Sequence, residues 1–357
     1  MKLSQRSHHS ASRVFSSSLR TSTMALLAAL ALGSLASNAL AQSAAQASHE
    51  NQESQESVKT RKALFVIVDG ISADTIESTY TPNLDAIAQS HGYTRSTVGG
   101  EIGTPSESPT ISAVGYNSLL TGTWANKHNV YSNAIKAPNY DYWDIFRILK
   151  HARQDAYTAL FSTWEDNRTG LLGEGLLQAG GHKLDYAFDG LEKDEQRFPH
   201  DKNSDYIEKI DSAVVADAAR VLQARGPDLS WVYLQHTDDI GHRFGDSPEF
   251  TAAIELMDSK LGQLWRAVQK RQQEHNEDWI VIITTDHGRD AETGKHHGGQ
   301  SARERSTWIV TNSAYTTDHF QQLPSIVDIL PSILEHLAVE APAAVSAEFD
   351  GASFIER

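Results

Sequence analysis

Short, uninterrupted apolar runs constrain the fold of this chain more than any other feature. Residues 63–68 read Ala-Leu-Phe-Val-Ile-Val, residues 231–234 and 279–283 repeat the pattern, and residues 307–310 give a weaker example. Such runs are typical of strands buried on both faces, whereas a strand with one wet face alternates apolar and polar residues. The runs therefore predict a sheet that is covered on both sides.

Stretches with helical patterning separate these runs. They lie at residues 83–90, 206–224, 248–274 and 325–337. Strands that alternate with helices form parallel sheets, so we predict an α/β fold whose mostly parallel central sheet carries helices on both faces. Residues 164–204 are rich in Gly, Asp, Lys and Phe and interrupt the alternation, which makes them a candidate cap insertion.

The N-terminal segment has the order of a secretory signal. Residues 1–41 contain four basic and no acidic residues, an apolar stretch at 24–32, and small residues that end in Ala-Leu-Ala. This order predicts cleavage before Gln42 and a periplasmic or secreted protein without a membrane anchor. A membrane anchor or a disordered tail is the alternative, although the apolar run is shorter than a membrane span of about 20 residues. Residues 42–60, rich in Ser, Gln and Glu, are expected to form a disordered spacer.

Composition excludes several function classes. The 357 residues include no cysteine, which rules out disulfides, thiolate zinc sites and a cysteine nucleophile. The formal net charge of −15 argues against sequence-independent nucleic-acid binding, which needs a basic surface. It remains compatible with a small anionic substrate, because bound metal cations reverse the local field.

Acidic and imidazole side chains follow the ends of three apolar runs. They are Asp69 after the first run, Asp238 and His242 after the second, Asp286 and His287 after the third, and His296 and His297 farther along the chain. Ligand sites of open α/β sheets form at the carboxyl ends of the strands. Unpaired buried charges are costly, and a shared metal ion removes that cost. Asp and His without thiolates suit zinc, manganese or a similar divalent ion.

Each of these groups alone has a simpler interpretation. Asp69 and the glycine after it could form an ordinary turn, and Asp286 with His287 could be a helix cap beside a solvated neighbour. Asp238 and His242 could be an i,i+4 pair on a helix. The two adjacent histidines near residue 296 could belong to a solvated loop. Their coincidence at one edge of the sheet favours a metal centre.

Further motifs occur in a fixed order along the chain. They are Thr-Pro-Asn-Leu-Asp at 81–85, Leu-Leu-Thr-Gly at 119–122, Asp-x-x-Gly-His at 238–242, Thr-Asp-His-Gly at 285–288, and Asp-Ile-Leu-Pro at 328–331. In this order they resemble the alkaline phosphatase superfamily, and within it the type I phosphodiesterase/nucleotide pyrophosphatase branch. The resemblance covers residues 63–353. It implies that residues 61–357 form an alkaline phosphatase-like catalytic domain.

The resemblance also implies a nucleophile. In that family it lies ten residues before the glycine of the Leu-x-Thr-Gly element, which selects Ser112, with Thr110 as the alternative. The diesterase branch usually carries Thr there followed by an Asn-His pair, whereas this chain has Gly115 and Tyr116. The phosphate-contacting asparagine, twenty-one residues after the nucleophile, corresponds to Asn133.

The family pattern further implies two divalent metal ions, zinc by default, with manganese also admitted by the ligands. The first set comprises Asp69, Ser112, Asp286 and His287; the second comprises Asp238, His242 and His297, with His296 as the alternative to His297. A metal-bound serine oxygen becomes nucleophilic without a dedicated base. No Gly-x-Ser-x-Gly elbow surrounds Ser112, which disfavours an α/β-hydrolase.

We therefore expect an exported two-metal hydrolase of small anionic phosphate esters, acting through a covalent phosphoseryl intermediate. Phosphodiesters or nucleotide pyrophosphates are favoured as substrates because Asn133 matches that branch. A phosphomonoesterase, a phosphonate hydrolase or a sulfatase-like enzyme of the same superfamily is the alternative. From another class, a metal-dependent phosphomutase or a non-catalytic binder of phosphate ligands would retain much of the same site.

Overall fold

The structure is a computed structural model, and it describes residues 58–89 and 91–357. The predicted signal segment and residues 42–57 of the predicted spacer lie outside the described residues. Within the described part of the chain, no helix is both long and apolar enough to cross a membrane.

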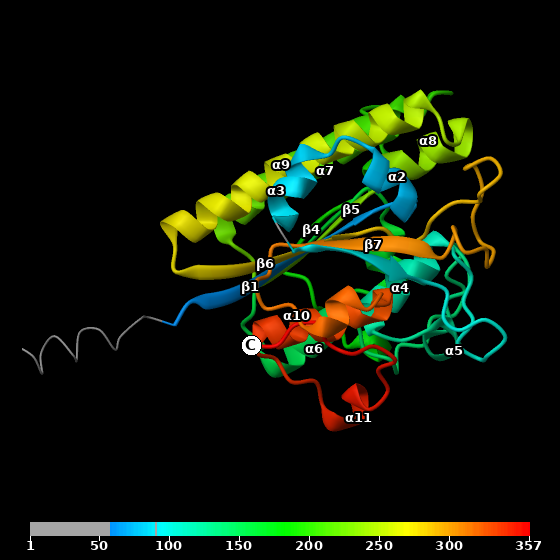
Figure 1. The fold of residues 1–357 in the computed structure, drawn as a ribbon. Helices are drawn as coiled ribbons and strands as arrows, with labels where there is room; N and C mark the ends of the chain where they lie inside the picture. Colours follow the sequence, from blue (N-terminus) through cyan, green and yellow to red (C-terminus); the bar gives the residue numbers. More distant parts are fainter. Residues whose placement is uncertain (1–57, 90) are drawn as a thin grey trace, which may run out of the picture. The chain divides into compact units, whose positions relative to one another are not determined.

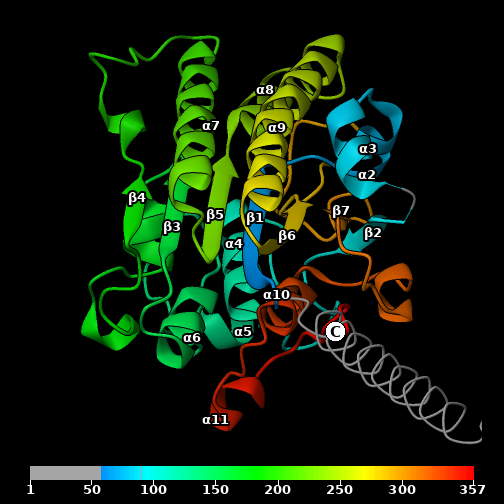
Figure 2. The same ribbon diagram turned by 90° about the vertical axis from the view of Figure 1, so that its left-hand side faces the viewer.

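Seven strands form one sheet in the order β2-β7-β6-β1-β5-β3-β4 (Figures 1 and 2). Their bounds are β1 Thr60–Val68, β2 Tyr93–Thr97, β3 Thr158–Ser162, β4 Tyr186–Phe188, β5 Leu229–Leu234, β6 Glu277–Thr284 and β7 Ser306–Thr311. Strand β7 is antiparallel to both of its neighbours, and the other pairings are parallel. The predicted α/β fold with a mostly parallel sheet is confirmed.

Helices cover both faces of the sheet, as predicted. On one face lie α4 (Ser112–Thr121), α6 (Ile145–Ala152) and α10 (Ile329–Leu337); on the other lie α3 (Pro82–Ala88), α7 (Asp205–Arg225) and α9 (Pro248–Glu274) (Figure 1). Alternate residues of β1 enter two separate cores: Phe65 and Ile67 pack on the first face, Leu64 and Val66 on the second. Burial on both faces explains why β1 has an unbroken apolar sequence.

The sheet register brings the ends of three central strands to one level. Val68 at the end of β1 pairs with Leu234 at the end of β5, and Ile67 pairs with Thr284 at the end of β6. The residues that follow these strands therefore begin side by side at the carboxyl edge, where parallel sheets bind ligands.

Shorter elements complete the chain. They are α2 (Ala73–Ser78), α5 (Ala125–His128), α8 (His236–Phe244), α11 (Ala343–Ser346), the π-helical turn η1 (Asn167–Leu171), and the 3₁₀ turns η2 (Leu177–Ala179), η3 (Leu191–Lys193), η4 (Asp318–Gln321) and η5 (Ile326–Asp328). Residues 164–204, predicted to be a cap insertion, contain η1, η2, η3 and the edge strand β4. Part of this stretch thus extends the sheet, and its role as a cap stays a prediction.

Candidate metal centre and active site

The carboxyl edge of the sheet brings the predicted site residues together. Asp69 directly follows β1, α8 follows β5 and carries Asp238 and His242, and Asp286 and His287 follow β6. The loop between β6 and β7 contributes His297. Three parallel strands and one loop therefore deliver all the predicted Asp and His ligands to one place.

The first group of ligands surrounds the ring nitrogen Nε2 of His287. Asp286 Oδ2 lies 3.2 Å from this atom, Asp69 Oδ1 lies 3.3 Å away, and Ser112 Oγ lies 3.4 Å away. The His287 side chain is 0% exposed. The four residues of the first predicted metal set thus meet in the interior.

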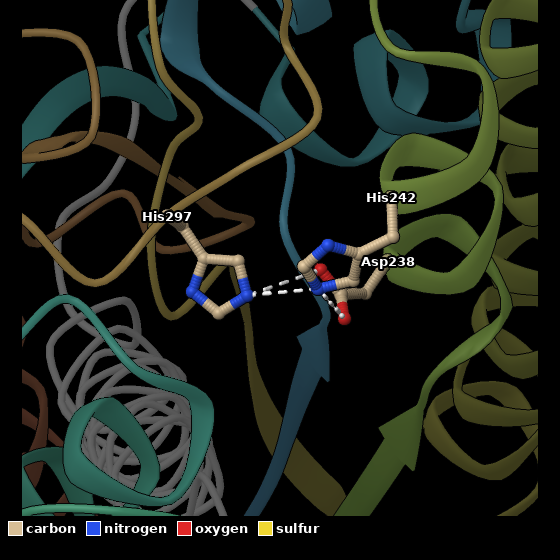
Figure 3. A group of neighbouring side chains, drawn as sticks. All are labelled: Asp238, His242 and His297. Atoms are coloured by element: carbon tan, nitrogen blue, oxygen red, sulfur yellow. Dashed lines mark hydrogen bonds and ion pairs between the residues drawn. The ribbon is translucent and has the colours of Figure 1, made fainter.

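The second group lies beside the first and opens to solvent. Asp238 and His242 stand one helical turn apart on α8 and face His297 on the opposite loop (Figure 3). His242 Nε2 lies 3.2 Å from Asp238 Oδ2 and 3.0 Å from His297 Nε2. The His242 side chain is 45% exposed, so this side of the centre is the accessible one. The helical i,i+4 pair considered from the sequence therefore also contacts His297 at the carboxyl edge of the sheet.

All three histidines present the same nitrogen to the centre. Each Nδ1 lies against a backbone carbonyl: His287 with Gly288 at 2.9 Å, His297 with Thr110 at 2.8 Å, and His242 with Lys295 at 2.7 Å. When such an imidazole is neutral, an Nδ1–H that donates to a carbonyl leaves Nε2 unprotonated and able to bind a metal ion, which is the common arrangement of metal-binding histidines.

The electrostatics of the centre fit a bound cation. Asp69 Oδ1 and Asp286 Oδ2 are buried carboxylate oxygens that make no regular hydrogen bond among the described residues, and both face the single ring nitrogen Nε2 of His287. Burial, together with the nearby Asp69, raises the pKa of Asp286 well above its usual value. Burial disfavours charge on His287, yet Asp286 and Asp69 together raise its pKa to about 9. Buried carboxylates without partners are costly, and a divalent cation between them would remove that cost.

Two overlapping groups of side chains bring their oxygen and nitrogen atoms close enough together to share a metal ion. They are Asp238 with His242 and His297, and Asp69 with Asp238 and His287, and the atoms of each group lie within 4.8 Å of one another. Asp238 belongs to both groups, whereas Asp286 of the first predicted set belongs to neither. The residues present therefore fit one or two divalent ions.

Helix α4 places Ser112 and Asn133 beside this centre. Ser112 is the first residue of α4, and the next N–H, that of Ala113, donates to Asn133 Oδ1 at 3.0 Å. Thr110 is engaged elsewhere, because its hydroxyl donates to the Gly299 carbonyl at 2.9 Å. The geometry thus favours Ser112 over Thr110 as the hydroxyl that faces the ligands.

The structure gives a physical reason for the departure at Gly115 and Tyr116. A Cβ at Gly115 would lie 2.7 Å from the carbonyl oxygen of Asp286, so a glycine is needed for α4 to approach this ligand. Tyr116 and Tyr233 both donate to Asp69 Oδ2, the latter at 2.7 Å. Two phenols therefore fix one oxygen of Asp69 and turn the other toward His287, a role that the sequence analysis missed.

A buried arginine was also missed. Arg289 is 0% exposed, and its guanidinium is paired with Asp238 Oδ1. It also donates to the carbonyl oxygens of Gly70 and Asp238, both at 2.8 Å. A Cβ on Gly241 would lie 2.5 Å from Arg289 Nη2, so the glycine of the Asp-x-x-Gly-His motif makes room for this side chain.

A family model matches most of the chain. Residues 63–332 match the family described as type I phosphodiesterase / nucleotide pyrophosphatase.

Two curated relatives are similar over part of their length. A Schizosaccharomyces pombe protein described as an uncharacterized pyrophosphatase/phosphodiesterase is 25% identical over 242 residues, covering 63% of this chain and 44% of the relative. A 2,3-bisphosphoglycerate-independent phosphoglycerate mutase of Haloquadratum walsbyi is 28% identical over 185 residues, covering 50% of this chain and 34% of the mutase. The chain thus spans less than half the length of either relative.

Among solved structures, murine ectonucleotide pyrophosphatase / phosphodiesterase 5 has a similar fold. The TM-score is 0.53 at 15% identity, and the match covers 79% of this chain and 96% of the murine chain. One structure of an inactive form of that murine protein is a complex with AMP.

Proposed function

The chain belongs to the type I phosphodiesterase / nucleotide pyrophosphatase family, and on that premise we propose that it is a metal-dependent hydrolase of phosphate esters. Phosphodiesters or nucleotide pyrophosphates are the proposed substrates. The AMP complex of the murine structural relative supports a nucleotide among them.

One observation carries this proposal: three imidazole nitrogens and two buried carboxylate oxygens, which share a single imidazole between them, converge beside a serine hydroxyl. A merely structural cluster would satisfy these buried oxygens within the protein. We assign Asp69, Ser112, Asp286 and His287 to one metal ion and Asp238, His242 and His297 to the other. His296 is exposed, whereas the side chain of His297 is 9% exposed and faces His242, which supports His297 as the ligand.

Divalent cations, zinc or alternatively manganese, would when bound lower the pKa of the serine hydroxyl and neutralise charge on the phosphoryl oxygens. In the proposed first step, Ser112 Oγ attacks phosphorus, the Ser–O–P bond forms, the bond from phosphorus to the leaving oxygen breaks, and the proton lost by the serine is balanced by the one that the leaving alcohol takes up from solvent. In the second step a water molecule attacks phosphorus, the Ser–O–P bond breaks, and the two protons of the water end on Ser112 Oγ and on the product phosphate or solvent, so that one water is consumed for each ester cleaved.

Two features of the chain assist at the phosphoryl group. Ser112 stands at the N-terminus of the ten-residue helix α4, where the helix dipole favours negative charge. The Oδ1 atom of Asn133 is held by the Ala113 N–H, so its Nδ2 group is the end that can donate to a non-bridging phosphoryl oxygen.

A phosphomutase is the second candidate because one curated relative is a phosphoglycerate mutase. A mutase must return the phosphoryl group from the serine to a bound alcohol, and it would release little free phosphate product into water. The predicted secretory signal argues for a hydrolase instead, because we also propose that the protein is exported to the periplasm or secreted.

The test is hydrolysis of a chromogenic diester, bis(p-nitrophenyl) phosphate, beside its monoester, p-nitrophenyl phosphate. We expect the diester to be cleaved faster, the activity to disappear in excess chelator, and zinc or manganese to restore it. A faster reaction with the monoester would reassign the substrate class. Undiminished turnover in a metal-free, chelator-treated sample would refute the metal-dependent mechanism.

A further inference from the structure

The loop between β6 and β7 is organised by a single carboxylate, that of Asp290. Its two oxygens accept four backbone N–H groups from the same loop, those of Glu292 at 3.0 Å, Thr293 at 2.7 Å, Lys295 at 2.9 Å and His296 at 2.8 Å. The Thr293 hydroxyl donates to it as well, at 2.9 Å. A carboxylate with this many donors fixes the backbone of a whole turn.

The backbone that Asp290 fixes controls both histidines of the second group. His297 belongs to this loop, directly after the His296 N–H that Asp290 holds. Lys295 donates its backbone N–H to Asp290, and its carbonyl oxygen accepts a hydrogen bond from His242 Nδ1. One ligand and the orienting partner of another therefore depend on the same turn.

The Asp290 carboxylate makes its hydrogen bonds within the loop that carries His297. Each hydrogen bond that its oxygens make joins residues 290–296 to one another. Residues 291–293 are exposed. Although burial opposes charge on Asp290, the backbone donors hold its pKa well below the usual value, so the accepting form persists.

We propose that Asp290 is a positioning residue for the second metal site, and this inference rests on the proposed function. By fixing the 290–296 turn it holds His297 and the Lys295 carbonyl in the geometry that lets His242 and His297 share an ion with Asp238. The first set, around His287, takes its ligand atoms from β1, α4 and the end of β6, and its contact with the loop is the stacking of the His287 ring on His297, with ring centroids 3.6 Å apart.

Asp290→Asn is a sharp test because it changes the volume very little. An amide group has one acceptor oxygen and one NH₂ donor, so either orientation sets the NH₂ against two backbone N–H groups of the turn. Glu292→Gln is the matched control, since it removes the same charge from the same loop at an exposed side chain. If the lost charge acts at long range, metal binding should weaken in both variants. If Asp290 positions the turn, metal binding should weaken only in Asp290→Asn.

The experiment measures zinc binding to the full-length protein by competition with a chromogenic chelator, together with zinc content after dialysis. We expect two ions in the parent and in Glu292→Gln. In Asp290→Asn one ion should stay at parental affinity, and the other should bind about 10- to 100-fold more weakly, the range found when outer-shell partners of ligands are lost. Hydrogen exchange of the 291–296 amides should accelerate in the same variant.

Other outcomes separate this inference from the proposed function. Two ions at parental affinity in Asp290→Asn, or equal weakening of both ions, would overturn the role of Asp290 while leaving the metal centre intact. Loss of the cooperative unfolding transition in metal-free Asp290→Asn would make the residue structural and also overturn the inference. A parent protein that binds no zinc would overturn the metal centre itself, and the positioning role with it.

Discussion

Gly241→Ala should destabilise the protein even though alanine is the better helix former. Gly241 lies within α8, where alanine would ordinarily add about 0.5–1 kcal/mol of stability. Here the new Cβ would lie 2.5 Å from Arg289 Nη2, too close for a real contact. The guanidinium must move, and because Arg289 is fully buried we expect its pairing with Asp238 to break.

The magnitude follows from these two opposing effects. Breaking a buried ion pair lowers the unfolding free energy by about 3–5 kcal/mol, because each charge then stays buried without its partner. After the helix-propensity gain is subtracted, the unfolding free energy should fall by about 2–4 kcal/mol. At roughly 2–4 °C per kcal/mol for a domain of this class, Tm should fall by roughly 4–16 °C.

A double-mutant cycle with Arg289→Met makes the test specific. Methionine lacks the guanidinium atoms that the alanine Cβ would strike, so Gly241→Ala should be neutral or slightly stabilising in that background. Denaturant unfolding of the four metal-free proteins would give the coupling energy, which we expect to be at least 2 kcal/mol. An equal loss of stability in both backgrounds, or a parental Tm for Gly241→Ala alone, would refute the steric argument.

Three further predictions concern metal affinity, pH and export. Tyr116→Phe combined with Tyr233→Phe removes both donors to Asp69 Oδ2, so calorimetric zinc titration should show weaker binding at the first site by about 10-fold or more, and unchanged affinity would disprove the orienting role. Burial lowers the pKa of His128 to about 3, so the unfolded state binds a proton at a higher pH than the folded state does. The unfolding free energy should therefore drop by up to about 1.4 kcal/mol per pH unit as the pH falls from 6.5 to 3. Denaturant titrations test this, and parallel pH profiles for the parent and His128→Asn would contradict it. Residues 1–45 fused to a reporter that functions only outside the cytoplasm should give signal, and an uncleaved, inactive fusion in the cytoplasm would count against export.

Local sequence patterns were sufficient to predict the central strands and the long helices. The run at 63–68 lies within β1, and the predicted helix at 248–274 coincides with α9, because both elements bury continuous or periodic apolar faces. The strands β2, β3 and β4 were missed. They are only three to five residues long, and β2 has the polar sequence Tyr-Thr-Arg-Ser-Thr, so their place in the sheet comes from tertiary pairing.

The site was predictable where ligands directly follow strands, and less so where its support comes from elsewhere in the fold. Asp69 and Asp286 stand next to apolar runs, which marked them in the sequence. Tyr233 lies inside such a run and looks like a core residue, yet its hydroxyl reaches a ligand. Arg289 and Asp290 follow a recognised motif, but both bond to backbone atoms, and the side-chain partner of Arg289, Asp238, lies 51 residues away; such contacts leave no local residue pattern to detect.

The central claim is that Ser112 attacks phosphorus, and trapping the covalent intermediate tests it most directly. Acid quenching during turnover of a phosphorus-labelled diester, followed by peptide mapping, should place the label on Ser112. Ser112→Ala should remain folded and bind no label, with turnover reduced by several orders of magnitude, on the scale of ~10⁶ for a lost nucleophile. Label on Thr110, or parental turnover by Ser112→Ala, would contradict the account.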